Sequence, residues 1–408
     1  MTKGPNKKVP PPSDADNIPD EIIDAADGGL GRITLRELLG MALSHVASAE
    51  RTNYLRGTAD DKGNGTYSRS IAVGSLPLQV LVPRTRTGEF RAKCLPGPYQ
   101  RAYPDEMRPV ILGMLAASRS LNAAGAALRK MGLHVSPDEI GTITQEIVDE
   151  LDLRNSRPID TDLICLYFDG KYVEIRDGDR LRPACIYTAI GITLQGKKRV
   201  LTCMPRLSKE NLEDWKWVLR NLIERGLRRV LIIIQDDFSG LLQTVRALFP
   251  KADVQLCMVH LLRNAKSHLG KSDAALFVQR IRALKASWDP DQASKQFDDL
   301  CQAFHAAAPT FCAELLKKKP HYLAFLQYPE PVRRTFSTTN AVEAINDQLE
   351  RMRINSGGYF HSEDSLKLKL GITLDYLETG TWRRVSNSIQ AVIHQLNAMF
   401  MDRFESDS

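Results

Sequence analysis

The sequence contains no long hydrophobic run and no paired cysteine motif. Its longest apolar runs, such as Val230 to Ile234, are strand-sized and fall far short of the ~20 apolar residues that a membrane-spanning helix requires. Residues 1 to 20 are rich in Pro, Lys and Asp and lack the apolar core of a secretory signal. The seven cysteines are scattered singly without a CxxC pair, which favours reduced thiols and argues against a zinc ribbon or finger. We therefore expect a protein that stays in the cytoplasm.

What the sequence does contain is an ordinary globular composition. Of its 408 residues, 43% are hydrophobic and 25% are charged, which lies outside the range typical of disordered chains. At roughly 150 residues per domain, this length predicts about two to three domains.

The first part of the chain is predicted to be mainly helical with a small β-hairpin unit. Residues 1 to 32 are expected to form a disordered tail, and a helix is expected from Thr34, a suitable N-cap, to about Ala49. Two short β-like runs, at 70 to 73 and 78 to 82, predict the hairpin. Further helices are predicted over the ranges 105 to 117, 121 to 131 and 137 to about 153. Residues 33 to 155 form the predicted N-terminal region.

Two features of this region suggest that it binds DNA. The joint at 117 to 120 and the break at 132 to 136 resemble the spacing of a helix-turn-helix motif, although short helix pairs are common. Between Arg51 and Val135 there are 13 Lys and Arg against 5 Asp and Glu, or +8, whereas the whole chain carries +6. Clustered cations neutralise phosphates and release counterions. The alternative interpretation is a basic face that is simply solvated.

From about Asp162 the pattern changes to strands. Strand-like runs at 163 to 168, 171 to 175, 184 to 192 and 198 to 204 are separated by turn residues, and the first is expected to end at Asp169-Gly170. A helix over 210 to 226, a fully apolar strand at 230 to 234, a helix over 240 to 248, a strand at 253 to 256 and a helix from Cys257 follow. The order βββαβαβα is that of the ribonuclease H fold and predicts a mixed five-stranded sheet.

This order brings two aspartates together. The first strand and the 230 to 234 strand are joined by a crossover and are expected to lie parallel and adjacent. Asp169 and Asp236 follow these strands. The carboxyl ends of adjacent parallel strands form the crevice in which α/β sheets bind ligands. Each aspartate also has a local interpretation, Asp169-Gly170 as a turn and Asp236 or Asp237 as a helix cap.

A pair of close carboxylates suggests a divalent metal ion. Two carboxylates repel each other unless a cation lies between them, and Mg²⁺ prefers oxygen ligands while keeping positions for water and phosphate. Two ions about 3.5 to 4 Å apart stabilise both oxygens of an in-line phosphoryl displacement. The candidate third carboxylate is Glu343, which opens a helix running to about Met352. Taken locally, Asn340 and Glu343 also match a capping box, with Asn340 as N-cap.

Several motifs, in order, resemble the IS256 and Mutator-like transposase family over about residues 35 to 395. They are the region Tyr67 to Gly88 with the basic helical segment after it, Asp169-Gly170, Asp236-Asp-Phe-Ser-Gly240-Leu, Phe249-Pro-Lys-Ala-Asp-Val-Gln255-Leu-Cys257-Met-Val-His260-Leu-Leu-Arg263-Asn264, Arg333-Arg-Thr-Phe-Ser-Thr-Thr-Asn340-Ala-Val-Glu343-Ala-Ile-Asn346 and Gly358-Tyr-Phe360. This resemblance implies a DDE transposase with a ribonuclease H-like core at 160 to 268 and 336 to 395. It also implies an all-α insertion at 269 to 335 and an N-terminal DNA-binding region.

The resemblance assigns roles to individual residues. It implies that Asp169, Asp236 and Glu343 are catalytic and hold two Mg²⁺ (or Mn²⁺) ions, with Asp237 as the fallback for the second acid because the family usually has Gly there. Cys257 and His260 match its CxxH pair, which we interpret as structural support beside the site, as we do Asn340. The expected DNA-binding residues are Arg84, Arg86, Arg119, Arg129, Lys130 and Arg263. Trp288, in the insertion, either stacks on a displaced base or packs in the core.

The sequence thus predicts an insertion-sequence transposase. We expect it to bind the terminal inverted repeats and target sites of double-stranded DNA, to cleave and transfer strands, and to act as a homodimer or larger assembly on DNA. The expected location is the bacterial cytoplasm, in association with the nucleoid. Two alternatives stay open: a transposase-derived DNA-binding regulator without strand chemistry, and a metal-dependent nuclease.

Overall fold

The structure is a computed structural model that describes residues 34–58, 60–73, 76–97, 104–131, 133, 135–285 and 289–405. The chain divides into two compact units, 1–140 and 141–408. The division falls within one helix, α5 (Pro137–Ser156), so most of this last helix of the predicted N-terminal region belongs to the second unit. The predicted tail at 1 to 32 and Trp288 lie outside the described residues. Within those residues, no helix is long and apolar enough to cross a membrane.

In the first unit a long helix packs on a β-hairpin. Helix α2 (Leu35–Arg56) begins at the predicted N-cap Thr34, which forms a capping box with Glu37, and it continues beyond the predicted end at Ala49. Strands β1 (Gly63–Val73) and β2 (Leu76–Thr85) form the predicted antiparallel hairpin and are longer than expected. The predicted helix pair follows as α3 (Pro104–Ala117) and α4 (Leu121–Lys130).

The core of this unit explains how the helix and hairpin hold together. Ala47 of α2 packs with Ile71, Leu78 and Val80 of the hairpin. Helix and strand approach closely at Gly40, where a Cβ atom would lie 2.4 Å from the Gln79 carbonyl oxygen, so glycine is required there. The first six residues of β1 are exposed, whereas β2 has buried residues along its whole length.

The second unit is built on a mixed sheet, five-stranded in the described part of the chain. Its strands are β3 (Leu163–Asp177), β4 (Arg180–Thr193), β5 (Lys198–Arg206), β6 (Val230–Gln235) and β7 (Asp253–Leu256). The spatial order is β5-β4-β3-β6-β7, antiparallel from β5 to β3 and parallel from β3 to β7. The predicted element order and the parallel adjacency of the first strand and the 230 to 234 strand are therefore confirmed.

One strand differs from its prediction. We expected the first strand to end at Asp169-Gly170 and a second to begin at 171, but β3 runs unbroken to Asp177. The interpretation of Asp169-Gly170 as a turn was therefore wrong. Both residues pair with β4, as Asp169 with Thr188 and Gly170 with Tyr187, because the antiparallel hairpin extends well beyond the end of β6. The parallel pairing with β6 stops at Tyr167 and Ile234, so Asp169 still lies where its parallel neighbour ends.

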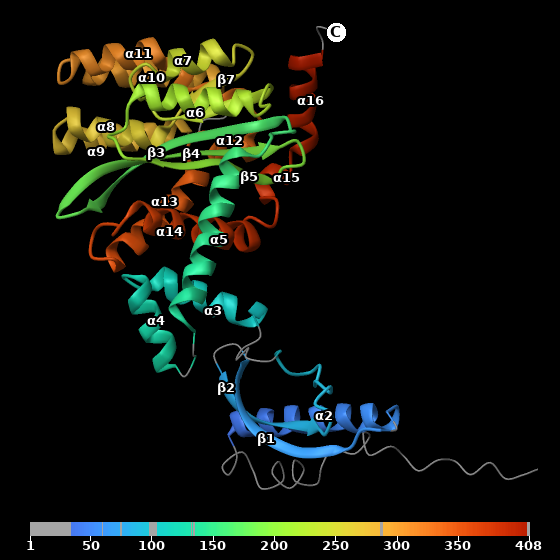
Figure 1. Ribbon diagram of the computed structural model, residues 1–408. Coiled ribbons are helices and arrows are strands. Elements are labelled where there is room, and N and C mark those ends of the chain that lie inside the picture. Colours follow the sequence, from blue (N-terminus) through green and yellow to red (C-terminus); the bar gives the residue numbers. More distant parts are fainter. Residues whose placement is uncertain are drawn as a thin grey trace, which may run out of the picture. The chain divides into compact units, whose positions relative to one another are not determined.

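Helices cover both faces of this sheet, with α6 and α7 on one side and α5, α13 and α14 on the other (Figure 1). The helices of the second unit after α5 are α6 (Leu212–Glu224), α7 (Leu241–Leu248), α8 (Met258–His268), α9 (Lys271–Lys285), α10 (Pro290–Phe304), α11 (Pro309–Tyr322), the 3₁₀ turn η1 (Ala324–Gln327), α12 (Glu330–Phe336), α13 (Asn340–Asn355), α14 (Glu363–Tyr376), the π-helical turn η2 (Leu377–Thr381), α15 (Asn387–Gln390) and α16 (Ile393–Glu405). Between α8 and α13 the described chain is helical, as the sequence predicts for the insertion.

Packing fixes where the strand ends lie. Every residue of β6 is buried, as expected for a strand covered on both faces. At the outer edge of the sheet, the Asn155 side chain of α5 bonds both the amide and the carbonyl of Cys203 in β5, at 2.8 and 3.2 Å. This contact satisfies part of an exposed strand edge.

Candidate active site

The two predicted aspartates lie close together, Asp169 buried and Asp236 partly exposed. Asp169 projects from β3 just beyond its pairing with β6, and it is only 5% exposed. Asp236 directly follows β6, and its Oδ1 accepts a hydrogen bond from the Phe238 amide at 3.3 Å. Burial, reinforced by the Asp236 carboxylate, raises the pKa of Asp169 to about 6. Burial also raises the pKa of Asp236. The ionised forms of both aspartates are therefore unfavourable in this site when no cation is bound.

Asp236 and its neighbour Asp237 have different partners. Both oxygens of Asp237 accept hydrogen bonds from Lys318 Nζ, at 2.7 and 2.8 Å, and Oδ2 also accepts one from the Tyr322 hydroxyl at 3.1 Å. Lys318 and Tyr322 belong to α11, so Asp237 ties the helical insertion to the end of β6. The structure thus places Asp236 beside Asp169 and gives Asp237 a structural contact.

A fourth carboxylate, Glu210, lies beside the two aspartates. It stands just before α6, and its Oε1 accepts a hydrogen bond from the buried indole of Trp215 at 2.8 Å. A Cβ atom on Gly170 would lie 2.7 Å from the same oxygen, so the glycine after Asp169 makes room for this side chain. Burial and the charges of Asp236 and Asp169 raise the pKa of Glu210 to about 7.

The sequence analysis missed Glu210 because it stands in a polar segment that resembles an ordinary helix start. Asn211 is in fact the N-cap of α6. The available signal was Gly170, since a glycine in a strand interior often marks the close approach of another group.

Two cations from α8 partly balance these acids. His260 Nε2 lies 3.8 Å from Asp169 Oδ1, and Arg263 Nη1 lies 3.2 Å from His260 Nε2. Burial by itself lowers the pKa of His260, but the Cys257 side chain and the two aspartates outweigh it and raise that pKa to about 9. Although burial disfavours a thiolate, the contact with His260 lowers the pKa of Cys257. Cys257 Sγ also lies 3.5 Å from Thr339 Oγ1, just before α13. The pair thus lies beside the aspartates and links α8 to the segment leading into α13.

Helix α13 brings the third predicted acid to the same place. Glu343 lies in its first turn, 31% exposed, with Oε1 at 3.8 Å from Arg263 Nη2. One turn further on, Asn346 Nδ2 donates to Asp169 Oδ2 at 2.7 Å. The capping-box alternative is not observed, because the N-cap is Thr339, which makes no side-chain cap bond, and Asn340 is the exposed first residue of the helix. In this arrangement Glu343 contacts Arg263, and Asn346 contacts Asp169.

The oxygen-rich composition of this cluster matches the preference of Mg²⁺ or Mn²⁺. Asp169, Asp236, Glu210 and Glu343 supply carboxylates, and the buried Asn346 Oδ1 has no hydrogen-bond partner among the described residues. Hard divalent cations take this kind of oxygen donor. Within the described residues, no three side chains of His, Cys, Asp or Glu are already grouped to hold an ion. The donors therefore suit the ion, while Glu343 pairs with Arg263.

The predicted DNA-binding cations are exposed and lie mainly in the first unit. Arg84 and Arg86 belong to the hairpin and the loop after it, and Arg119, Arg129 and Lys130 lie around α4. The Arg84 guanidinium lies 5.6 Å from the centre of the Tyr67 ring. Both residues line a groove of about 850 Å³ that Arg69 and Arg91 also border. Arg263 is 62% exposed and belongs to the second unit instead.

Known proteins resemble this chain over most of its length. The family described as "Transposase, Mutator family" matches residues 17–382. The chain belongs to the Mutator family of transposases. A probable transposase for an ISRM3-like insertion sequence element of Sinorhizobium fredii is 28% identical to this transposase over 92% of the chain and 94% of the relative. The transposase for insertion sequence element ISRM3 of Rhizobium meliloti is 27% identical with the same coverage.

The predicted relationship to IS256 and Mutator-like transposases is thereby confirmed. The transposase for insertion sequence element IS256 in transposon Tn4001 of Staphylococcus aureus is 23% identical over 78% of this transposase and 83% of the relative. A solved Drosophila P element transposase strand transfer complex matches 75% of this chain and 87% of its own at 13% identity, with a TM-score of 0.24. Family membership makes DNA transposition the general function of this transposase.

Proposed function

We propose that this transposase uses a DDE mechanism, with Asp169, Asp236 and Glu343 as its catalytic acids. The observation that carries the proposal is that two aspartates from adjacent parallel strands meet α13, where Asn346 bonds Asp169 and Glu343 lies beside Arg263. The sheet order β5-β4-β3-β6-β7 supports a ribonuclease H-like core interrupted by the helical insertion.

The reaction is hydrolysis at each element end followed by strand transfer. Water attacks the scissile phosphorus and the 3′ oxygen leaves as a free hydroxyl. That 3′ oxygen then attacks a second phosphodiester, and the strand it joins loses its own 3′ oxygen as the leaving group. When bound, two Mg²⁺ or Mn²⁺ ions stabilise the attacking and leaving oxygens. The natural ligands are Asp169, Asp236 and Glu343.

The other residues orient and balance this site. Asn346 fixes the Asp169 carboxylate by its hydrogen bond to Oδ2. His260 and Arg263 place positive charge among the acids, and Arg263 is exposed enough to reach a DNA phosphate. Asp237 holds α11 against the end of β6. Each of these contacts limits how far the carboxylates can move.

Binding of the element ends is assigned to the first unit. Its exposed cations, Arg84, Arg86, Arg119, Arg129 and Lys130, provide the charge that phosphate contacts need. The ligand is double-stranded DNA, first the terminal inverted repeats and then the target. Joining two ends requires at least a homodimer on DNA, and the setting is the bacterial cytoplasm and its nucleoid.

The test is Mg²⁺-dependent cleavage and strand transfer on DNA that carries the element's own ends. The variants are Asp169→Asn, Asp236→Asn and Glu343→Gln, with Asp237→Asn as the matched control because Asp237 already has Lys318 and Tyr322 as partners. Loss of cleavage in the first three, with DNA binding retained, supports the DDE assignment. Wild type that binds the ends without cutting them indicates a regulator. Cutting without joining indicates a nuclease.

A further inference from the structure

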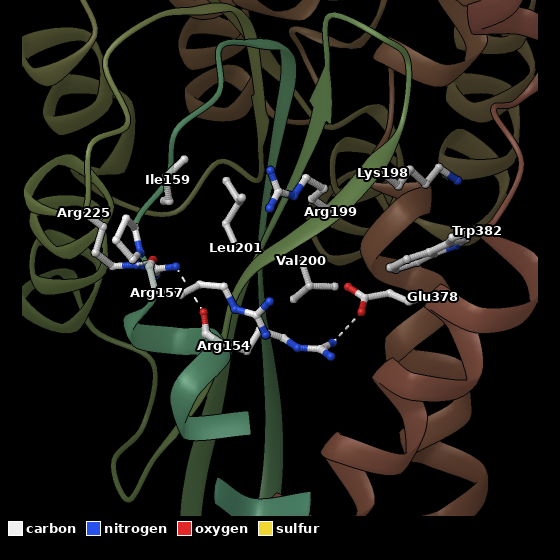
Figure 2. A pocket seen from close by; sticks show the side chains of 11 residues that line it. Arg154, Arg157, Ile159, Lys198, Arg199, Val200, Leu201, Arg225, Glu378 and Trp382 are labelled. Carbon is white, nitrogen blue, oxygen red and sulfur yellow. Dashed lines mark hydrogen bonds and ion pairs between the residues drawn. The ribbon is translucent and has the colours of Figure 1, made fainter. Parts of the chain in front are cut away.

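A cavity lined by cations lies at the opposite end of α6 from the acids. Arg154 and Arg157 at the end of α5, Lys198 and Arg199 of β5, and Arg225 just after α6 border it (Figure 2). Trp382 and Glu378, beside and within the π-helical turn η2, form another part of the wall. Because α6 has 13 residues at 1.5 Å each, roughly 20 Å separate the two ends of this helix. This cavity is therefore distinct from the candidate active site.

The charges around the cavity do not balance. Five cations and one carboxylate, Glu378, line it, which leaves +4. The carboxyl ends of α5 and α6 each supply about half a negative charge, so roughly +3 is left. The further carboxylates that pair with Arg157 and Arg199 are Glu150 and Asp160, whose side chains are 52% and 83% exposed. Ion pairs that are this exposed neutralise and stabilise the two arginines only weakly.

Two of the cations have no carboxylate partner among the described residues. Arg225 donates to the carbonyl oxygens of Arg157 and Arg154, at 2.9 and 3.1 Å, and to the Asn221 amide oxygen, all of which are neutral. Lys198 lies 5.4 Å from the centre of the Trp382 ring. Burial lowers the pKa of both, and for Arg225 the nearby Arg157 adds to the effect. Partly buried cations without a counterion are unfavourable, and a bound anion relieves this.

The size of the cavity limits the ligand. Its volume is about 220 Å³, which is below the ~300–1,000 Å³ usual for small-molecule and cofactor sites. A single tetrahedral anion suits it better than a whole nucleotide. Arg157 and Arg199 lie at the rim of the cavity, where their side chains are 44% and 45% exposed. The cavity is therefore open to a ligand from solvent.

We propose that this cavity binds a phosphate group, with Lys198 beside Trp382 as its main ligand and the other lining cations adding positive charge. A DNA backbone phosphate is one source, which rests on the proposed function above, and free inorganic phosphate is the other. A DNA phosphate held here lies roughly 20 Å or more from the acids, or about six nucleotides along one strand.

The test uses the full chain and Lys198→Met, which keeps the aliphatic stem beside Trp382 and removes the charge. Lys216→Met is the matched control, because Lys216 lies on α6, pairs with Glu213 and does not line the cavity. In the first arm, DNA affinity is measured against NaCl concentration. If Lys198 contacts a DNA phosphate, Lys198→Met should make the negative slope of log K against log salt less steep by about 0.9. The control should change this slope by only a small fraction of that amount.

The second arm follows tryptophan fluorescence during titration with inorganic phosphate at constant ionic strength. A response that is lost in both Lys198→Met and Trp382→Phe, but kept in Lys216→Met, identifies free phosphate as a ligand. The proposal is wrong if Lys198→Met keeps the wild-type melting temperature and changes neither the salt dependence of DNA binding nor the fluorescence response to phosphate. Both arms measure binding without strand cleavage. A transposase that fails to cleave therefore contradicts the proposed function and leaves this test intact.

Discussion

At the scale of single residues, the main feature of this transposase is an excess of buried negative charge. Asp169, Asp236 and Glu210 converge where β6 ends, and His260 and Arg263 balance them only in part. A group with a raised folded pKa binds protons more tightly in the folded chain than in the unfolded chain. The metal-free protein must therefore lose stability as these groups give up their protons.

We expect the free energy of unfolding, measured by urea in EDTA, to fall as pH rises from about 4 to 7. The pKa of Asp169 is about 6 in the folded chain against an ordinary 3.8, and that of Glu210 is about 7 against 4.5. Each group therefore lowers the free energy of unfolding as pH rises from its ordinary pKa to its raised pKa. Above pH 7, His260, with a pKa of about 9 against 6.5, loses its contribution, whereas the lowered pKa of its partner Cys257 adds one, so the two oppose each other. For the buried Asp169 the effect is about 3 kcal/mol.

The substitution Asp169→Asn should flatten the lower part of this profile and stabilise the metal-free protein at pH 8 by about 2 to 3 kcal/mol. Asp179→Asn, at the exposed turn between β3 and β4, should leave the wild-type profile unchanged. A wild-type stability that rises between pH 4 and 7 would show that the acids are not the unfavourable groups we describe.

Gly170→Ala tests the close approach of Glu210 to β3. The new methyl group would lie 2.7 Å from Glu210 Oε1, so we expect Glu210 to move and its hydrogen bond from Trp215 to break. Loss of one such bond costs about 1 kcal/mol. The measurements are urea unfolding and the near-ultraviolet dichroism of tryptophan. Gly141→Ala, in α5 with no atom near its Cβ position, should instead stabilise by about 0.5 to 1 kcal/mol.

At the scale of elements, two helices from distant parts of the sequence complete the site. Helix α13 runs along β3, where Asn346 contacts Asp169 and Glu350 pairs with Lys171 at 3.3 Å. Helix α11 is attached to the end of β6 through Lys318 and Asp237. The insertion therefore restrains the segment that carries Asp236.

Lys318→Met and Lys317→Met form a matched pair for this attachment. Lys318 and Asp237 are 26% and 17% exposed, and removing the lysine leaves a largely buried carboxylate whose only other partner in the described part of the chain is Tyr322. We expect a loss of about 2 kcal/mol in the free energy of unfolding. Lys317 is 70% exposed and pairs with Glu314, so its substitution should change stability by less than about 0.5 kcal/mol. Equal effects of the two would show that α11 is held by apolar packing alone.

At the scale of the whole molecule, the two units carry different parts of the proposed function. The acids lie in residues 141–408, whereas the exposed hairpin and the groove beside it lie in residues 1–140. A two-stranded ribbon is one of the shapes that the DNA major groove admits. Binding and chemistry should therefore respond to different substitutions.

The double variant Arg84→Gln with Arg86→Gln should lower the salt slope of DNA binding by about 1.8, or 0.9 for each phosphate contact. The control is Arg36→Gln with Arg56→Gln, which removes the same charge from exposed positions of α2. Equal slopes in the two double variants would mean that the charge of the first unit acts diffusely rather than through the hairpin.

The sequence by itself determined the order of the elements, the family, and the pairing of the two parallel strands that carry Asp169 and Asp236. Each depends on a local pattern: the apolar run from Val230 to Ile234 is strand-forming, and a crossover makes its neighbour parallel. The extent of β3 was not predictable in the same way. Its continuation through Gly170 depends on pairing with β4 rather than on its own composition.

The tertiary structure decided which side chains meet. The family motif favoured Asp236 over Asp237, but only the fold shows what Asp237 does: it bonds Lys318 and Tyr322, 81 and 85 positions away. Glu210 beside Asp169 and the cations around the α6 cavity likewise come from separate elements. Such contacts carry no periodic signal, because helices and strands record which face is buried and not which distant residue will cover it.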